Sequence, residues 1–184
     1  MRLHTTVVAI IALLALAATG CGGPSADEKW AASVCTAMDD YTTDMFDAYD
    51  RVQRTRATPG RDNKADMYGA IYAGLRHTDK LATRLKAIDS PPTRSGRRAK
   101  RLVDWEVGHA RKPLEEMQRK LRKLPESLTL VQNSLLLNDL ELALVTAVNF
   151  GTSTPPPNIF PVLGKVFQES DECSRLLADL KGGS

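Results

Sequence analysis

Apolar residues recur every three or four positions through most of this chain of 184 residues. That spacing places apolar side chains along one face of an α-helix, whereas strands need a period of two. The helical pattern covers residues 26–57, 63–89, 94–123 and 127–150, and a last segment covers 161–180. Thr58-Pro59-Gly60 and Ser90-Pro91-Pro92 interrupt it with residues that end helices. We therefore predict an all-α fold, a bundle of four to five helices.

Two of the predicted helices have unusual sequences. Pro113 lies inside the third helix, where its missing N–H group should kink or split the helix. The fourth is apolar on nearly every side, which predicts a central, buried helix. Polar residues such as Asp139 and Glu141 interrupt it, so we do not interpret it as a membrane span.

The N-terminus has the form of an export signal. A basic start at Arg2 precedes an apolar run over residues 7–18, and small residues follow. This order is typical of a secretory signal peptide, and the run is too short to cross a bilayer comfortably. We therefore predict that residues 1–20 are a cleaved signal and that the mature protein lies outside the cytoplasm.

The end of that signal, Ala18-Thr19-Gly20-Cys21, resembles the lipobox of bacterial prolipoproteins, although Ala18 stands where leucine is commonest. The resemblance implies that Cys21 becomes the mature N-terminus and carries a diacylglyceryl group with acyl chains such as palmitate. Two acyl chains hold a protein stably on a membrane. The expected location is the extracytoplasmic face of the cell membrane. The Arg- and Ala-rich composition resembles that of small lipoproteins of high-GC Gram-positive bacteria.

The lipobox also fixes the expected domain limits. Residues 21–25 form a short lipidated tether, and Ser25-x-x-Glu28 matches a capping box that opens the first helix. The helical bundle domain then covers residues 26–184. The lipobox resemblance covers only about the first 22 residues, and we recognise no family in the rest of the chain.

The three cysteines fit this interpretation. If Cys21 carries lipid, two cysteines are left to pair with each other: Cys35 in the first predicted helix and Cys173 in the last. An oxidising compartment favours a structural disulfide between them. A redox or metal-binding thiol pair is the alternative, but there is no Cys-x-x-Cys motif and no histidine nearby.

Charge is unevenly distributed, although the net charge is only +3. Residues 51–123 contain twenty bases and eight acids, whereas residues 27–50 contain seven acids and one base. The densest basic cluster consists of Arg94, Arg97, Arg98, Lys100 and Arg101. Outside the cell such a cluster can bind anionic lipid, a phosphorylated wall polymer or an envelope protein, and we expect no nucleic acid partner. The alternative is a solvated helix face.

Two other groups are candidates for metal chemistry. Asp40, Asp44 and Asp47 share one side of the first predicted helix, where they either pair with basic neighbours or form a site for Ca²⁺ or a basic partner. Glu106 and His109 form a Glu-x-x-His pair of the kind that di-iron bundles use, but a second such pair is missing. They are weak candidates, and we expect no metal and no cofactor.

No sequence motif indicates an enzyme. The chain has no Gly-rich phosphate loop, no Gly-x-Ser-x-Gly and no His-Glu-x-x-His. The stiff loop Pro155–Pro161 holds Ile159 and Phe160, which either close the core or anchor a partner. We expect a non-enzymatic binding or scaffolding module of the cell envelope. The alternative is a carrier of an apolar or lipid ligand in a pocket between the helices, lined by the fourth helix.

Overall fold

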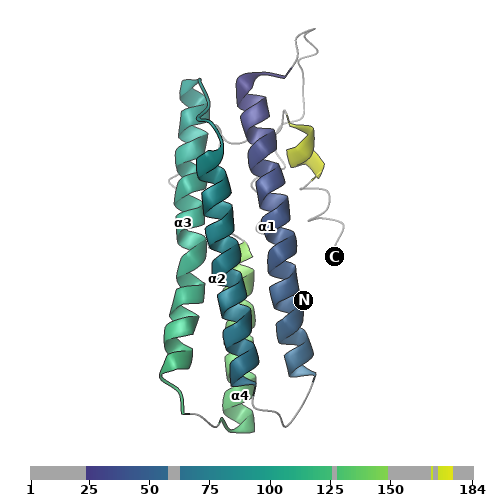
Figure 1. Cartoon of the computed structure of the whole chain (residues 1–184), viewed down its shortest axis with the longest axis vertical. Coiled ribbons are helices and arrows are strands. Elements are labelled where there is room, and N and C mark those ends of the chain that lie inside the picture. The colour runs from purple at the N-terminus through teal and green to yellow at the C-terminus, as the bar shows by residue number, and fades with distance from the viewer. Residues whose placement is uncertain (1–23, 58–62, 126–127, 149–166, 168–169, 176–184) are drawn as a thin grey trace. The chain divides into compact units, whose positions relative to one another are not determined.

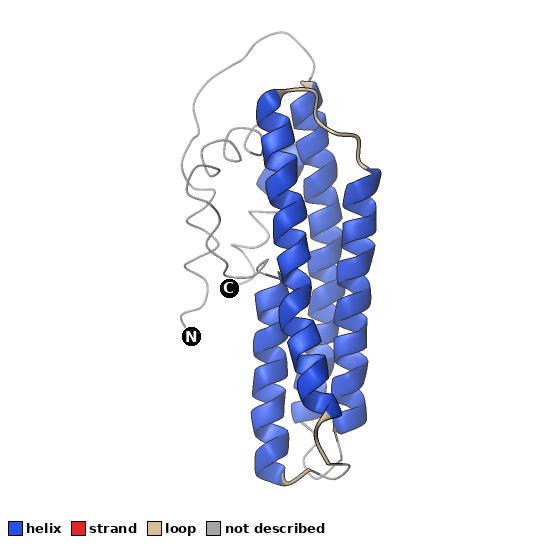
Figure 2. Cartoon of the chain, turned by 90° about the vertical axis from the view of Figure 1, so that its left-hand side faces the viewer, coloured by secondary structure: helices blue, strands red, loops and turns tan. Residues whose placement is uncertain are grey.

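Four long helices make up most of the described chain (Figure 1). The computed structural model describes residues 24–57, 63–125, 128–148, 167 and 170–175. The helices are α1 (Ala26–Arg56), α2 (Lys64–Ala87), α3 (Arg94–Arg122) and α4 (Leu130–Val148). Residues 171–175 are also helical, and the described residues form no strand (Figure 2). The predicted all-α fold is confirmed.

Helix caps set most of the boundaries. The Ser25 amide donates to the Glu28 carboxylate, and the Glu28 amide donates to Ser25 Oγ over 3.1 Å. This confirms the predicted capping box at the start of α1. The predicted start of the fourth helix at residue 127 was too early, because α4 begins at Leu130. Thr129 and Gln132 form a second capping box just before it, with amide-to-side-chain distances of 3.0 and 3.2 Å.

The chain divides into two compact units, and α1, α2 and α3 contribute residues to both. Unit 1 holds residues Met1–Asp39, Arg84–Trp105 and Thr154–Ser184. Unit 2 holds Asp40–Thr83 and Glu106–Ser153.

Unit 2 is a four-helix bundle with antiparallel neighbours. The buried Tyr41 hydroxyl of α1 lies 3.3 Å from the Thr78 hydroxyl of α2 and donates to the Ala147 carbonyl of α4 over 3.2 Å. Tyr49 of α1 also donates to Glu141 of α4, over 2.7 Å. Burial raises the pKa of Tyr41 to about 12, so its hydroxyl keeps the proton that these bonds need. One side chain of α1 thus joins both of its neighbours in this unit.

The helices of unit 2 differ from the expectations in two respects. Pro113 does not split α3, which runs without a break from Arg94 to Arg122. Buried Ala110, Leu114 and Met117 lie on both sides of the proline, and their packing outweighs one missing hydrogen bond.

The fourth helix is not buried on every side. Leu136, Leu140 and Leu144 face the core, but Leu130 and Val131 are 73% and 70% exposed. Leu135 and Leu142 are exposed as well. The residues of unit 2 therefore bury one face of α4, and an apolar composition alone was a poor guide to its position.

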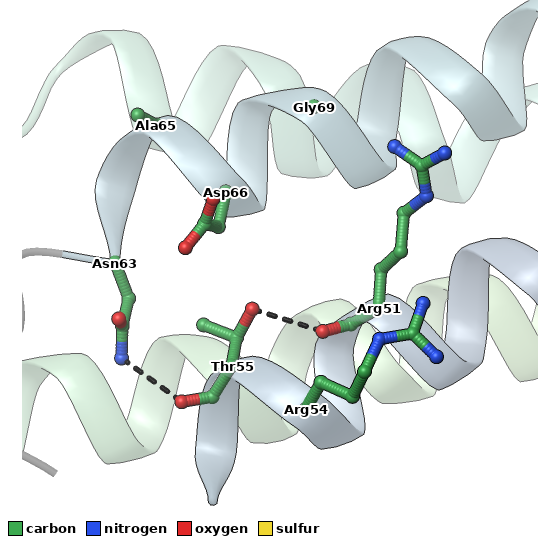
Figure 3. A pocket seen from close by; sticks show the side chains of 7 residues that line it. All are labelled: Arg51, Arg54, Thr55, Asn63, Ala65, Asp66 and Gly69. Carbon is green, nitrogen blue, oxygen red and sulfur yellow. Dashed lines mark hydrogen bonds between the residues drawn. The ribbon is translucent and has the colours of Figure 1, made fainter. Parts of the chain in front are cut away.

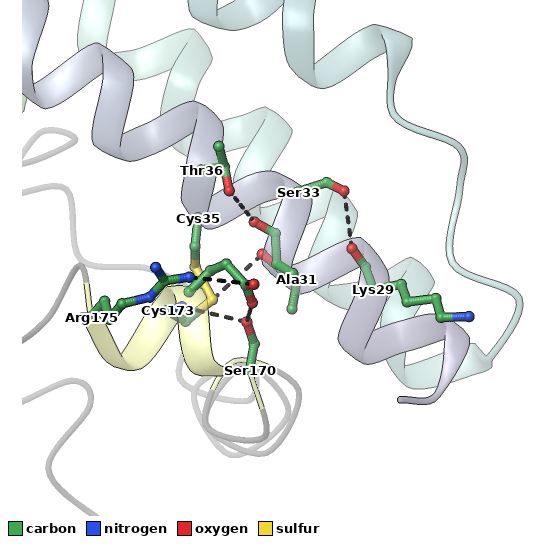
Figure 4. Close-up of a disulfide and its surroundings, with 10 residues drawn as sticks. Lys29, Ala31, Ser33, Cys35, Thr36, Ser170, Cys173 and Arg175 are labelled. Carbon is green, nitrogen blue, oxygen red and sulfur yellow. Dashed lines mark hydrogen bonds and ion pairs between the residues drawn. A yellow bond between two sulfur atoms is a disulfide. The ribbon is translucent and has the colours of Figure 1, made fainter. Parts of the chain in front are cut away.

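Unit 1 ties the C-terminal segment to α1. A disulfide joins Cys35 of α1 to Cys173, as predicted (Figure 4). The Trp30 and Phe167 rings meet edge to face, with centroids 5.7 Å apart. Ser170 caps the helical turn that carries Cys173, whose amide donates to Ser170 Oγ over 3.4 Å. Covalent and aromatic contacts thus hold this short segment on the helix.

Removing the disulfide should weaken the fold strongly. The bond closes a loop with a sequence separation of 138 residues. In the chain-entropy model a loop of that size stabilises the folded state by about 5 kcal/mol, as an upper value. We expect the Cys35→Ala/Cys173→Ala variant to unfold at a clearly lower denaturant concentration than the oxidised protein. Chemical reduction of the natural protein should have the same effect, and equal unfolding midpoints would contradict the prediction.

Candidate functional site

Several sequence-predicted features lie outside the described residues. These are the signal peptide of residues 1–20, the lipobox with Cys21, and the loop Pro155–Pro161 with Ile159 and Phe160. Most of the predicted last helix, 161–180, lies outside as well. The described chain starts at Pro24, only three residues after the expected lipidation site.

The start of α3 lies directly against the first turn of α1. The Thr93 hydroxyl donates to the Asp27 carboxylate, and it also accepts the Gly96 amide over 2.9 Å as the cap of α3. Gly96 makes this approach possible. A Cβ atom there would lie 2.4 Å from Pro91 Cβ and 2.6 Å from Asp27 Oδ1, so no larger residue fits. The contact brings together residues that are 66 positions apart.

This contact determines where the basic cluster lies. Four of its members, Arg94, Arg97, Arg98 and Arg101, are exposed on the first two turns of α3. Among the described residues no carboxylate pairs with Arg94, Arg98 or Arg101, and Arg97 donates to the Pro92 carbonyl.

Lys100 differs from these arginines. It is less exposed, and its Nζ lies 3.3 Å from Asp104 and 3.5 Å from the Leu85 carbonyl. The structure thus separates Lys100, which joins parts of unit 1, from an arginine cluster that consists of Arg94, Arg97, Arg98 and Arg101.

The arginine cluster lies at the N-terminal end of α3, where positive charge destabilises a helix. The N-terminus of a helix carries about half a positive charge, and bases there are unfavourable by roughly 0.3–1 kcal/mol each. The first turn of α3 contains no acid, whereas that of α1 contains Asp27 and Glu28. The four exposed guanidinium groups, at the positive end of the helix dipole, form a surface that attracts anions.

The second candidate pair, Glu106 and His109, does not form a metal site with the described residues around it. In the described part of the chain, no group of three or more His, Cys, Asp or Glu residues is arranged so that it could hold a metal ion. Glu106 is half-buried, and its Oε2 atom is buried without a hydrogen-bond donor among the described residues. This burial raises the pKa of Glu106 to about 7.

The acidic side of α1 pairs with α2 through Asp44. Asp44 Oδ2 lies 2.7 Å from Lys80 Nζ and 3.3 Å from His77 Nδ1. The Lys80 hydrogen bond is the main reason why the pKa of Asp44 lies below its usual value. For Asp44 the interpretation as a partner of basic neighbours is confirmed.

The structure adds a pocket that the sequence did not reveal. It lies between the end of α1 and the start of α2, within unit 2, and most of its lining is polar. The polar residues of the pocket are spread over positions 51–66, on both sides of the break between α1 and α2. They therefore form no compact sequence motif that would predict the pocket.

No protein-family model, no curated protein and no solved structure matches the chain. In the described ranges, none of the helices has the length and apolar character needed to cross a membrane.

The raised pKa of Glu106 predicts a pH dependence of stability. Its folded-state pKa of about 7 exceeds the ordinary value of 4.5. Folding therefore favours the protonated carboxyl, and the stability present below pH 4.5 is lost as the pH rises through about 7. We expect Glu106→Gln to raise the melting temperature relative to the natural protein by more at pH 8 than at pH 5.

Glu116→Gln, at an exposed position of the same helix, is the control and should show no such pH-dependent gain. An equal effect of Glu106→Gln at both pH values would contradict the prediction. Thermal unfolding followed by circular dichroism measures both variants.

Proposed function

We propose that this chain is a lipid-anchored envelope protein whose folded part is a non-enzymatic binding module at the outer face of the cytoplasmic membrane. The arginine cluster is its membrane-facing surface and holds anionic lipid headgroups. The observation that carries the proposal is the hydrogen bond between Thr93 and Asp27, which fixes the start of α3 against the start of α1.

The length of the tether supports this arrangement. Asp27 follows Cys21 by six residues, which span at most about 20 Å when fully extended. Acyl chains on Cys21 would therefore hold the first turn of α1 close to the lipid surface. The arginine cluster, which begins one residue after Thr93, would lie in the same zone.

Energetics favour lipid headgroups as the anion. Each Lys or Arg close to an anionic membrane contributes about 1 kcal/mol, and that contribution falls off over a Debye length of about 8 Å at physiological salt. Arg94, Arg98 and Arg101, which have no acidic partner among the described residues, would meet this condition if they lie close to lipid. Headgroup phosphates would also offset the repulsion from the helix dipole.

The anchor itself has a direct test. In an exporting host, the natural protein should stay with the membrane fraction after a high-salt wash and dissolve only in detergent. Its mass should exceed that of residues 21–184 by a diacylglyceryl group. Cys21→Ser should leave the protein without this mass and outside the detergent-extracted fraction. Natural protein that is soluble and carries no added mass would contradict lipidation.

The arginine cluster is tested without the anchor. In the Cys21→Ser background we compare Arg94→Gln/Arg98→Gln/Arg101→Gln with Arg119→Gln/Arg122→Gln/Lys123→Gln, a matched set at the other end of α3. The first set should lower binding to phosphatidylglycerol vesicles at least tenfold, since three contacts of about 1 kcal/mol each are lost. The second set should change it little.

Thermal unfolding distinguishes lost binding from lost folding. Removing positive charge from the N-terminus of α3 should leave the melting temperature unchanged or higher, because those charges oppose the helix dipole. Equal vesicle binding by both sets would refute the role of the arginine cluster while leaving lipidation intact.

A further inference from the structure

An open pocket of about 390 Å³ lies between the C-terminal end of α1 and the first turns of α2 (Figure 3). All the residues that line it belong to unit 2. They are Arg51, Arg54, Thr55, Asn63, Ala65, Asp66 and Gly69. The volume lies in the range of small-molecule sites, which begins at about 300 Å³.

Asn63 contributes a buried amide oxygen to the lining of this pocket. It is only 3% exposed, and its carbonyl accepts the Met67 amide over 2.9 Å as the cap residue of α2. Its side chain does not cap the helix in the ordinary way, because Nδ2 donates to the Thr55 carbonyl over 3.4 Å. Asn63 Oδ1 is buried without a donor among the described residues. A buried acceptor of this kind is costly unless a ligand or water donates to it.

Opposite charges line opposite ends of the pocket. Figure 3 shows the Asp66 carboxylate on the side of Asn63, with the guanidinium groups of Arg51 and Arg54 toward the other end. Within the part of the chain that the structure describes, no ion pair joins Asp66 to Arg51. One end therefore offers the Asp66 carboxylate and the Asn63 amide oxygen as acceptors, and the other offers the Arg51 guanidinium as a donor.

We propose that this pocket binds a small zwitterion with a primary ammonium group and a phosphate or carboxylate group. The ammonium group donates to the Asp66 carboxylate and to Asn63 Oδ1, since an ammonium has three N–H donors and no acceptor. The anionic group pairs with Arg51, whose planar guanidinium matches phosphate and carboxylate oxygens. Both charges are needed, because either half alone leaves one end of the pocket unpaired.

Calorimetric titration of the purified, detergent-extracted protein tests the ligand chemistry. Phosphoethanolamine and L-alanine carry both groups, whereas ethanolamine and inorganic phosphate carry one each. Phosphocholine keeps both charges but has no N–H donor. We expect at least one of the two zwitterions to bind tenfold or more tightly than ethanolamine, phosphate and phosphocholine. Equal binding of phosphocholine, or no binding of either zwitterion at millimolar concentration, would overturn the proposal.

A second experiment, with lipid vesicles, distinguishes a lipid headgroup from a soluble zwitterion. Tighter binding to vesicles with phosphatidylethanolamine than to phosphatidylcholine vesicles, competed by free phosphoethanolamine, would identify a lipid headgroup. Binding of the free compounds without any preference between the vesicles would identify a soluble ligand. Both results support the shared chemistry.

Variants test the two ends of the pocket separately. Asp66→Asn and Arg51→Gln should each weaken binding of the zwitterion tenfold or more. Asp39→Asn and Arg76→Gln change exposed residues of α1 and α2 that do not line the pocket, and should leave binding unchanged. Equal binding by all four variants would overturn the assignment.

Gly69 provides a test that preserves the fold. A Cβ atom at this position meets nothing within 4 Å, so larger residues fit there and improve the helix. Gly69→Gln should fill the pocket and reduce binding at least tenfold, while Gly69→Ala should keep most of it. Undiminished binding by Gly69→Gln with an unchanged circular dichroism spectrum would show that the ligand lies elsewhere.

Discussion

The apolar face of α1 is the surface on which both units are built. In unit 1 it carries the Cys35–Cys173 bond and the Trp30–Phe167 contact, which hold the C-terminal segment. In unit 2 it presents Tyr41, whose hydroxyl reaches both α2 and α4. Each unit packs on the buried apolar face of α1. A polar substitution on that face should therefore lower the stability of the packing around it and not only that of the adjacent side chain.

Basic residues lie at both ends of α3, where they stabilise the helix at one end and destabilise it at the other. Arg119 and Arg122 at its C-terminus interact favourably with the helix dipole. The arginine cluster at its N-terminus does not, yet it is kept exposed and, for Arg94, Arg98 and Arg101, without an acidic partner among the described residues. In the proposed membrane contact, anionic headgroups would neutralise these arginines and so remove the charge arrangement that weakens the helix.

Local patterns predicted the helices better than they predicted the sites. Periodicity and the Ser25 capping box gave α1 correctly, and the equivalent Thr129-x-x-Gln132 pattern could have placed the start of α4. The arginine cluster was visible as a run of charge. Its position beside Asp27 was not, because that contact spans 66 residues and depends on the missing side chain of Gly96. The pocket at Asn63 likewise depends on two helices whose relative placement no short motif encodes.

The disulfide also imposes an order in time. Cys173 follows Cys35 by 138 residues, so this disulfide can form only after almost the whole chain has been synthesised. Every residue of unit 2 precedes Cys173 in the chain, and its four helices can pack before the bond closes. Unit 1 combines the first, middle and last parts of the sequence and is therefore the part that is completed last. A chain cut short between Ser153 and Cys173 would keep all the segments of unit 2 but could not form the disulfide of unit 1.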